Sequence, residues 1–425
     1  MKAKNTNRQL AVGRKQFFIL FFAYCLLPTA YSQVLSLDSV LSRIEKNNPA
    51  LLSYSNKILS ADAKVDGAKM WMPPMVGTQL GENPYSFDFN NDTYQMMFFV
   101  EQNIPNQKRI KAKEGYLKSI SPQLQNEYGY LKNQFFAKAK ETYYERYVTE
   151  KKISIINQNI DLMKAMIDIS EKSLATGMGD LGSIYKMKAR LSDAETMLLN
   201  EQNMVKSLTA TLNYLMNQDV STGFSIDTNN IVKNYRNKSL ITVKDSLETK
   251  RSDIQRMNSE ISSMKLNQTL MGMESKPEYG VRLEHGIMFG NMRMSQYAAM
   301  FQMSIPIASW SSRGYKSEVK AMGFTISAME QDKQAMLNMA NQMVTMLILE
   351  MNTEYTYVDN YTKNVIPAYK KSFETNLLSY SQNTGDLMKA ILSWDDLQMA
   401  QMKYVEHLGK LLKAQTDYEK EMQIK

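Results

Sequence analysis

The feature of this sequence that most constrains its fold is a long internal repeat. Asn103–Pro105 and Ser304–Pro306, roughly 200 positions apart, each close an alternating stretch and open a long helical one. Gly179–Leu181 and Gly385–Leu387 each separate two helical runs at nearly the same offset. Prolines that end a helical run ahead of each alternating stretch form a third pair of landmarks. Three landmarks in the same order predict two similar halves, each made of helix, strand, strand, long helix, turn and helix.

The repeat divides the chain into four parts. These are an export signal at 1–32, a first repeat at 33–218, a connector without periodicity at 219–240 and a second repeat at 241–425. Each repeat is expected to hold one strand pair and one helical hairpin. The strands are expected at about 75–104 and 277–305, and the hairpins at about 107–217 and 309–420.

The first 32 residues have the composition of an export signal. Five Lys and Arg side chains, with no acid among them, precede an apolar run from Phe17 to Leu27. Ala30–Ser32 supplies small residues at the −3 and −1 positions, so we expect cleavage before Gln33. Cys25 is a candidate for lipid attachment, although Tyr24 before it is bulky where a small residue is expected.

Removing this segment changes what the composition implies. The formal net charge falls from +8 to +3, with 46 basic against 43 acidic residues, so the chain gives no argument for nucleic-acid binding. No cysteine remains, which excludes disulfides and cysteine-based zinc sites. The two histidines, His285 and His407, lack partners at metal-ligand spacing, and we expect them to pack or to lie at a surface. We therefore expect no enzyme activity and no cofactor.

Two alternating segments stand before each long helical run. In the first half one face would carry Tyr94, Met96, Phe98 and Val100, and the other Gln95, Met97, Phe99 and Glu101. Segments of about ten residues can cross a bilayer as tilted strands. Because no stretch after the signal approaches 18 continuous apolar residues, a chain that spans a membrane would do so with strands closed into a barrel. A small soluble sheet with one buried face is the alternative.

The helical runs show coiled-coil spacing. One seam steps by four and three residues through Met187, Leu191, Ala194, Leu198, Glu201, Val205, Leu208, Leu212 and Leu215. A second recurs at steps of seven through Met322, Met329, Met336 and Met343, with Met339 and Met346 beside it. Pro122 and Pro367 lie inside helical patterns and predict kinks or breaks there.

The turns of the two hairpins are the candidate functional site. They comprise Gly177, Gly179, Asp180 and Leu181 in the first half, and Thr384, Gly385, Asp386 and Leu387 in the second. Asp180 and Asp386 stand where each returning helix begins, so each can accept hydrogen bonds from free helix N–H groups. If several copies of the chain surrounded a pore, the same carboxylates would form a constriction that attracts cations; helix capping alone is the alternative.

The order and spacing of these elements resemble the TolC-type outer membrane efflux proteins. The residues that carry the resemblance are Leu37–Leu41, Asn47–Pro49, Ile104-Pro105, Ile305-Pro306, Val365–Tyr369, Tyr380 and Gly385–Ala390. The resemblance covers essentially all of the chain after the signal, and it rests on the order of these motifs rather than on any one of them. Pro122 within a long helix and the high methionine content depart from the family pattern.

The resemblance implies a mostly α fold with a membrane β-barrel. Three chains would each give four strands to a twelve-stranded barrel in the outer membrane of a Gram-negative cell, and their helices would form a periplasmic tunnel. The hairpin turns would contact a periplasmic adaptor linked to an inner-membrane pump of the RND type. The trimer also has a physical argument, because four strands alone would leave unpaired edges in lipid.

Methionine leaves a second reading open. The chain has 33 methionines, and thioether sulfur is a soft ligand that suits Cu(I). Met288, Met292 and Met294 are the weak candidates for such a site, which would suit a CusC-like Cu(I)/Ag(I) efflux duct or a metal-binding periplasmic protein. Methionine also fills irregular gaps between helices. A secreted coiled-coil structural protein is the remaining alternative.

Overall fold

The computed structural model describes residues 34–81, 85–86, 88, 90–175, 180–229, 231–236, 243–382 and 384–424. The expected export signal at 1–32, with the candidate lipidation residue Cys25, lies outside the described residues. So do Gly177 and Gly179 at the first hairpin turn, and part of the expected connector at 219–240.

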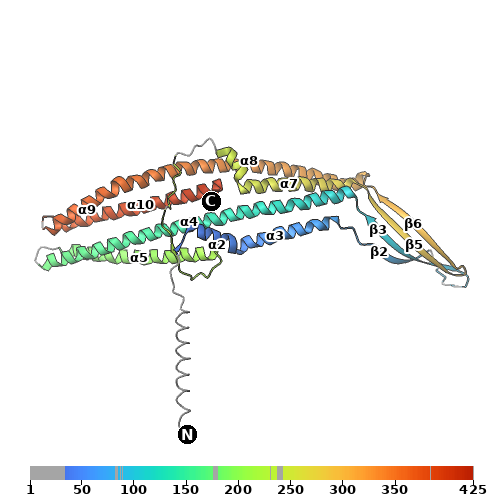
Figure 1. Ribbon diagram of the computed structural model, residues 1–425, viewed down its shortest axis with the longest axis horizontal. Helices are drawn as coiled ribbons and strands as arrows, with labels where there is room; N and C mark the ends of the chain where they lie inside the picture. The colour runs from blue at the N-terminus through green and yellow to red at the C-terminus, as the bar shows by residue number, and fades with distance from the viewer. Residues whose placement is uncertain are drawn as a thin grey trace, which may run out of the picture.

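The molecule is elongated, with helices at one end and a sheet at the other (Figure 1). The long helices are α4 (Gln107–Ala175), α5 (Leu181–Leu215), α8 (Ser309–Asn360), α9 (Ile366–Ser381) and α10 (Leu387–Met422). The shorter ones are α2 (Leu37–Asn47), α3 (Pro49–Asp66), α6 (Val243–Lys250) and α7 (Ser252–Gly272). At 1.5 Å per residue, α4 alone is about 100 Å long. In the part of the chain that the structure describes, no helix combines the length and the apolar character needed to cross a membrane.

Four antiparallel strands form the sheet in the order β2-β3-β5-β6. They are β2 (Met75–Leu80), β3 (Thr93–Ile104), β5 (Glu278–Gly290) and β6 (Met294–Ser304). The central β3–β5 pair joins the two halves of the chain, running from Thr93 opposite Gly290 to Ile104 opposite Tyr279. A separate small sheet pairs β1 (Val34–Leu35) with β4 (Ser225–Ile226) in parallel. The larger sheet therefore ends in two edge strands, β2 and β6.

The strand register confirms the predicted alternation. On one face Phe98 lies opposite His285, which in turn lies opposite Tyr297. On the other face Glu101 lies opposite Arg282. The apolar face consists mainly of Val76, Leu80, Tyr94, Met96, Phe98, Val100, Tyr279, Val281, Leu283, Ile287, Tyr297, Phe301 and Met303. The polar face carries Gln79, Gln95, Glu101, Arg282, Glu284, Gln296 and Gln302, with several methionines among them.

The break at Asn47–Pro49 is a change of helix rather than a loop. Asn48 ends α2, and its Oδ1 then accepts a hydrogen bond from the backbone N–H of Ala50 at 3.0 Å to begin α3. Pro49 occupies the first position of α3, where a missing N–H costs nothing. The Asn48 Nδ2 also donates to the Leu215 carbonyl at 3.0 Å, which fixes this corner against the end of α5.

The two prolines inside helical patterns have different outcomes. A π-helical turn, η3 (Tyr361–Val365), stands immediately before α9, and Pro367 falls in the first turn of that helix. A π turn widens the helix where the proline ring would otherwise clash with the preceding carbonyl, so the predicted irregularity is confirmed there. At Pro122 no break occurs, because α4 continues through it. Ser119, one turn earlier, bonds the hydroxyl of Ser263 on α7 at 2.8 Å, so a neighbouring helix supports this turn.

Apolar clusters hold the helices of both hairpins together. The cluster nearest the hairpin turns includes Ile156 of α4, Met187 of α5, Phe373 of α9 and Trp394 of α10. A second cluster joins α2 to α4, α5 and α10, and a third joins α6 to α8 and α10. Each fully buried Leu or Ile contributes about 1.5–3 kcal/mol, so these clusters make the two hairpins one packed unit.

The two predicted seams differ in what they bury. On α5 the seam faces inward, and Met187, Ala194, Leu208, Leu212 and Leu215 are all buried. On α8 the methionine seam is not a fully buried core, and Met322, Met329 and Met336 are half-buried. Met339 is 65% exposed and Met346 56% exposed, while the buried side of α8 includes Leu337, Val344, Leu347 and Met351. The helix therefore carries two apolar stripes, and within one chain only the second is fully buried.

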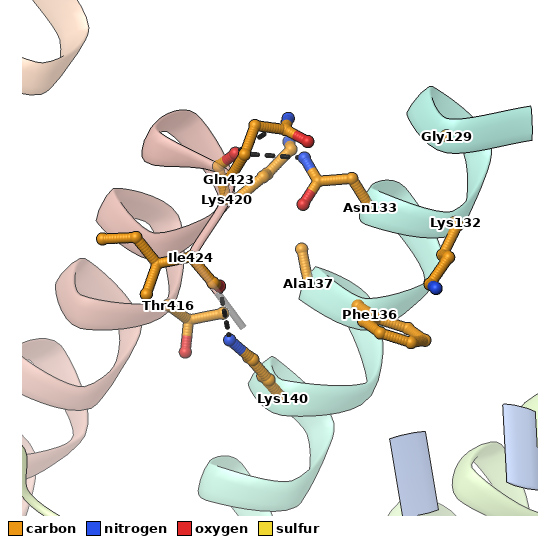
Figure 2. Close-up of a pocket in the computed structure, with 10 residues that line it drawn as sticks. All are labelled: Gly129, Lys132, Asn133, Phe136, Ala137, Lys140, Thr416, Lys420, Gln423 and Ile424. Atoms are coloured by element: carbon orange, nitrogen blue, oxygen red, sulfur yellow. Dashed lines mark hydrogen bonds between the residues drawn. The ribbon is translucent and has the colours of Figure 1, made fainter. Parts of the chain in front are cut away.

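The C-terminal end of α10 is hydrogen-bonded to the middle of α4 (Figure 2). The Asn133 Nδ2 donates to the Lys420 carbonyl at 3.0 Å, and the Lys140 Nζ donates to the Ile424 carbonyl at 3.2 Å. Lys140 also forms a buried ion pair with Glu419. Residues of both helices enclose a cavity of about 160 Å³ between these contacts, and Gln423 ends α10 in a left-handed conformation. The C-terminal helix is therefore anchored by charge and by backbone hydrogen bonds as well as by apolar packing.

Candidate functional site

The second hairpin turn is a tight connection from α9 to α10. The backbone N–H of Thr384 donates to the Ser379 carbonyl at 2.9 Å, and its hydroxyl donates to the same oxygen at 3.0 Å. The Asp386 Oδ1 accepts a hydrogen bond from the backbone N–H of Met388 at 3.0 Å and so caps α10, as predicted. Leu387, the next residue, is only 4% exposed. The turn thus presents Asp386 to solvent and buries its neighbour.

Gly385 is needed at this turn for steric reasons. A Cβ added there would lie 2.9 Å from the Ser379 Cβ, 3.2 Å from the Ser379 carbonyl carbon and 3.2 Å from the Tyr380 nitrogen. Two of these atoms belong to the backbone and cannot move aside without changing the turn. The glycine that marks the repeat in sequence therefore allows the chain to fold back closely on the end of α9.

The first turn has a stronger cap and a different apolar neighbour. The Asp180 carboxylate accepts hydrogen bonds from the backbone N–H groups of Gly182 at 3.1 Å and Ser183 at 2.9 Å. The Ser183 hydroxyl donates to it as well, at 2.6 Å. These hydrogen bonds, first that of the Ser183 hydroxyl, lower the pKa of Asp180 below its ordinary value. Leu181 is 50% exposed, unlike Leu387.

The end of α4 and the start of α5 lie at the same end of the bundle as the end of α9 and the start of α10, far from the sheet (Figure 1). Asp180 and Asp386 are the N-cap residues of α5 and α10, and each accepts hydrogen bonds from the first turn of its helix. Both carboxylates are exposed, so each caps a helix and still presents negative charge at this end of the molecule.

Contacts just behind the turns join the two hairpins, and the sequence did not reveal them. Arg190 of α5 forms an ion pair with Asp395 of α10, and its guanidinium lies 5.9 Å from the Trp394 ring centroid. The Trp394 Nε1 donates to the Oδ1 of buried Asn159 on α4 at 3.0 Å. The only local signal in the sequence was Trp394 next to Asp395. Their partners, Arg190 and Asn159, lie far away along the chain.

The polar face of the sheet carries a second charged group, centred on Arg282. The guanidinium lies 2.5 Å from a Glu284 carboxylate oxygen and 3.7 Å from one of Glu101. It donates to the Gln79 Oε1 at 3.0 Å and stacks over the Phe99 ring at 3.8 Å. Residues from three strands thus converge on one arginine. Arg282 and Glu284 lie two positions apart and so share one face of β5, but their cross-strand partners could not be read from the sequence.

The methionine candidates lie at the far end of the sheet. Met288 and Met294 are direct cross-strand partners on the polar face. The Gln296 Nε2 lies 3.5 Å from the Met288 sulfur. Met292 lies between the two strands and is exposed. Among the described residues there is no group of three or more His, Cys, Asp or Glu side chains that could hold a metal ion.

His407 is packed between α10 and α8. Its Nδ1 lies 2.7 Å from a Glu354 carboxylate oxygen, and its ring stacks on Tyr357 with centroids 4.2 Å apart. His285, by contrast, lies on the apolar face of the sheet. Neither histidine approaches the hairpin turns, so the candidate site there contains no general acid or base of this type.

The chain matches no family model, and no curated protein matches it. Solved structures do match. The outer-membrane channel OprN is 12% identical, with 91% of this chain and 89% of that chain covered at a TM-score of 0.74. CusC is 10% identical, with 91% of each chain covered at 0.74. The CmeC outer membrane channel of Campylobacter jejuni is 13% identical, with 91% and 85% covered at 0.72. The chain therefore has the fold of a single outer-membrane channel chain, which confirms the mostly helical architecture with a small antiparallel sheet that the TolC-type resemblance predicted.

Proposed function

We propose that this chain, built on the outer-membrane channel fold, is the passive exit duct of a tripartite efflux system. The observation that carries the proposal is a four-stranded sheet with an exposed apolar face, whose two edges have no partner strand among the described residues, attached to a helical bundle whose longest helix is about 100 Å long. Likeness to outer-membrane channels over 91% of the chain supports it. We place the protein in the outer membrane of a Gram-negative cell, with its helices in the periplasm.

The sheet supports a trimer closed through its edges. Leu283, Tyr297 and Phe301 are exposed on the apolar face, where lipid would cover them. β2 and β6 each offer a row of backbone groups that a neighbouring copy can pair with. Three copies would contribute twelve strands and leave no edge in the bilayer. The polar face would then line the pore, with Arg282 and Glu101 facing water.

The exposed seam of α8 supports contact between copies along the tunnel. Phe324, Met339, Met346 and Leu349 are each more than half exposed in the single chain. Apolar side chains at helical spacing are stabilised by burial against a second helix. We propose that the neighbouring protomer covers this stripe, so that its methionines fill gaps between helices of different chains.

The hairpin turns are the proposed contact with a periplasmic adaptor, which links the duct to an inner-membrane pump of the RND type. The residues are Gly177, Gly179, Asp180, Leu181, Thr384, Gly385, Asp386 and Leu387. The tight turn at Gly385 and the two aspartate caps support a defined shape at this end. We also propose that 33–218 and 241–425 are two repeats joined by a connector at 219–240, preceded by an export signal at 1–32.

A CusC-like duct for Cu(I) or Ag(I) is a second candidate. The observation that favours it is the pairing of Met288 with Met294 on the polar face, where two thioethers would face the pore. Gap filling accounts for methionines between helices, but it does not account for this pair. CusC and OprN match this chain with the same TM-score of 0.74, so the structural comparison does not favour a metal duct over another efflux duct.

The test is expression in a Gram-negative host followed by fractionation, detergent extraction and planar-bilayer recording. We expect a heat-modifiable trimer in the outer-membrane fraction that forms cation-preferring channels. Asp386→Ala should reduce the cation preference without changing the trimer. A chain that is monodisperse and monomeric in buffer without detergent would contradict the proposal.

A further inference from the structure

A cavity of about 430 Å³ lies where the sheet meets the helical bundle. It is enclosed by the segment before β2, the end of β3, the start of α4, the end of α7 and the start of β5. Its lining is mostly apolar, with Asn103 and four charged residues, Arg109, Lys113, Glu274 and Glu278, as the polar groups. The cavity therefore combines an apolar floor with two cations and two carboxylates.

The apolar part of the cavity continues from the apolar face of the sheet. Ile104 and Tyr279, which are partners at the last position of the β3–β5 register, both line it. Met70 is 70% exposed and Met72 64% exposed beside them, and Trp71 between these two is also exposed. Tryptophan and apolar side chains at the end of a membrane strand are typical of the level where acyl chains give way to headgroups.

The two positively charged side chains of the cavity lie near the N-terminus of α4, where positive charge is electrostatically unfavourable. Arg109 and Lys113 are four residues apart in the first turns of α4, and so share one face of the helix. The N-terminal end of a helix carries partial positive charge and stabilises anions. Arg109 is paired with Glu278, whereas Lys113 makes no ion pair with the described residues. An additional negative group at the cavity would stabilise this arrangement.

The carboxylates restrict which negative group fits. Glu274 is exposed at the cavity and, like Lys113, makes no ion pair among the described residues. A purely anionic ligand would gain from the cations but be repelled by Glu274 and Glu278. A zwitterion that presents a phosphate and a primary ammonium would meet both kinds of charge, and its ammonium can donate hydrogen bonds to carboxylate oxygens.

We propose that this cavity binds one phospholipid with an ethanolamine headgroup per chain. The phosphate lies between Arg109 and Lys113, the ammonium donates to Glu274 and Glu278, and the acyl chains run over Met70 and Met72 toward the apolar face. The proposal rests on the proposed function, because it requires the sheet to lie in a bilayer with this cavity at the periplasmic headgroup level. A lipid held here ties the membrane strands to the start of the longest helix.

The test uses the full-length trimer, delipidated in detergent and titrated with phosphatidylethanolamine, phosphatidylcholine or phosphatidylglycerol under native mass spectrometry. We expect up to three lipids per trimer and a preference for phosphatidylethanolamine of about tenfold over the other two, since charge-assisted hydrogen bonds separate the ligands. Phosphatidylcholine tests the ammonium, because its quaternary nitrogen cannot donate a hydrogen bond. Phosphatidylglycerol tests whether negative charge alone suffices.

Two variants test the ammonium and the phosphate of the headgroup separately. Glu274→Gln, an exposed change that leaves packing intact, should remove the preference for phosphatidylethanolamine over phosphatidylcholine. Lys113→Gln should weaken all three lipids alike. Lys111→Gln, on the same helix but outside the cavity lining, is the control and should change nothing.

Two results would overturn the inference: equal binding of all three lipids by the intact chain, or an unchanged preference in Glu274→Gln. Trimer formation and conductance are measured on the same material, so the two proposals can fail separately. A conducting trimer that binds the three lipids equally refutes only the lipid site. A chain that forms no membrane trimer refutes the exit duct and the lipid site together.

Discussion

At the scale of single residues, the most constrained group is the buried carboxylate of Glu419. It pairs with Lys140 and accepts hydrogen bonds at 2.7 Å from the Lys233 Nζ and from the Tyr235 hydroxyl. Burial by itself raises the pKa of a carboxyl, but the hydrogen bonds from Lys140 and Lys233 outweigh it and lower the pKa of Glu419 below 4.5. Burial, and then the hydrogen bond to Glu419, raise the pKa of the Tyr235 hydroxyl above its ordinary value.

These contacts give a stability prediction with a defined pH dependence. A carboxyl whose pKa is lowered on folding stabilises the native state above its ordinary pKa and loses that contribution as the pH falls through the folded value. Glu419→Gln should therefore cost about 3–5 kcal/mol at pH 7, because Lys140 stays buried without a counter-charge. The difference from the unaltered chain should shrink below a pH of about 4.5.

Chemical denaturation at pH 7 and at pH 4 measures both effects. The matched control is Glu406→Gln, which removes an exposed ion pair with Lys410 and should change the unfolding free energy by less than about 1 kcal/mol. Equal losses for the two variants at pH 7 would show that the buried pair has no special weight.

Glycine supplies a second residue-scale prediction through a matched pair. Gly385→Ala should lower stability by about 1–3 kcal/mol, because its Cβ would collide with the Ser379 backbone. Gly115→Ala, inside α4 with nothing within 4 Å of the added Cβ, should raise stability by about 0.5–1 kcal/mol. Thermal unfolding of both variants gives the comparison, and a change of the same sign in both would contradict the steric argument.

At the scale of elements, local patterns predicted more than long-range ones. The alternation in β3 and the seam of α5 depend on neighbouring residues and were predictable. Which strands pair across the halves, and that Arg190 meets Asp395, depend on segments far apart in sequence and were not. The methionine seam of α8 was recognised from its spacing, but the exposure of Met339 and Met346 was not predicted. A heptad identifies a stripe without saying whether its partner belongs to the same chain.

The contact between α5 and α10 yields a prediction about coupling between hairpins. Arg190→Ala and Asp395→Ala should each loosen the turn end of the bundle, and a double-mutant cycle should give a coupling of about 0.5–3 kcal/mol. In the proposed channel, either variant should increase the open fraction in single-channel recordings. Lys164 and Glu195, an exposed pair within the first hairpin, provide the control cycle. Coupling in the control equal to that of the test pair would remove the argument for a specific link.

At the scale of the whole molecule, the predicted mostly helical fold with a four-stranded antiparallel sheet is confirmed, while the two repeats and the assembly are proposals. The helices, the two strands of each half and their order along the chain follow from patterns within one chain, whereas the β3–β5 pairing across the halves does not. A ring of three chains cannot be read from one chain, although the open edges β2 and β6 and the exposed stripe with Met339 both call for partners.

Edge pairing between copies can be tested by cross-linking. Cys25 is the only cysteine in the sequence and lies in the expected signal, so introduced cysteines would be unique after cleavage. Thr78→Cys on β2 combined with Ala299→Cys on β6 should give covalent dimers and trimers, and no larger species, with a short bismaleimide. Either single variant alone should give none beyond background. A ladder extending past three would contradict a closed trimer.

The two edge strands of the sheet also have a genetic consequence, which concerns whether mutations in them are dominant or recessive. In the proposed trimer, β6 of each copy pairs with β2 of the next. One copy whose edge strand cannot pair therefore prevents the ring from closing. In a cell making intact and edge-defective copies in equal amounts, only about one ring in eight would consist entirely of intact chains if assembly were random. Mutations in β2 or β6 that preserve folding should therefore behave as dominant alleles, whereas mutations that prevent folding should be recessive.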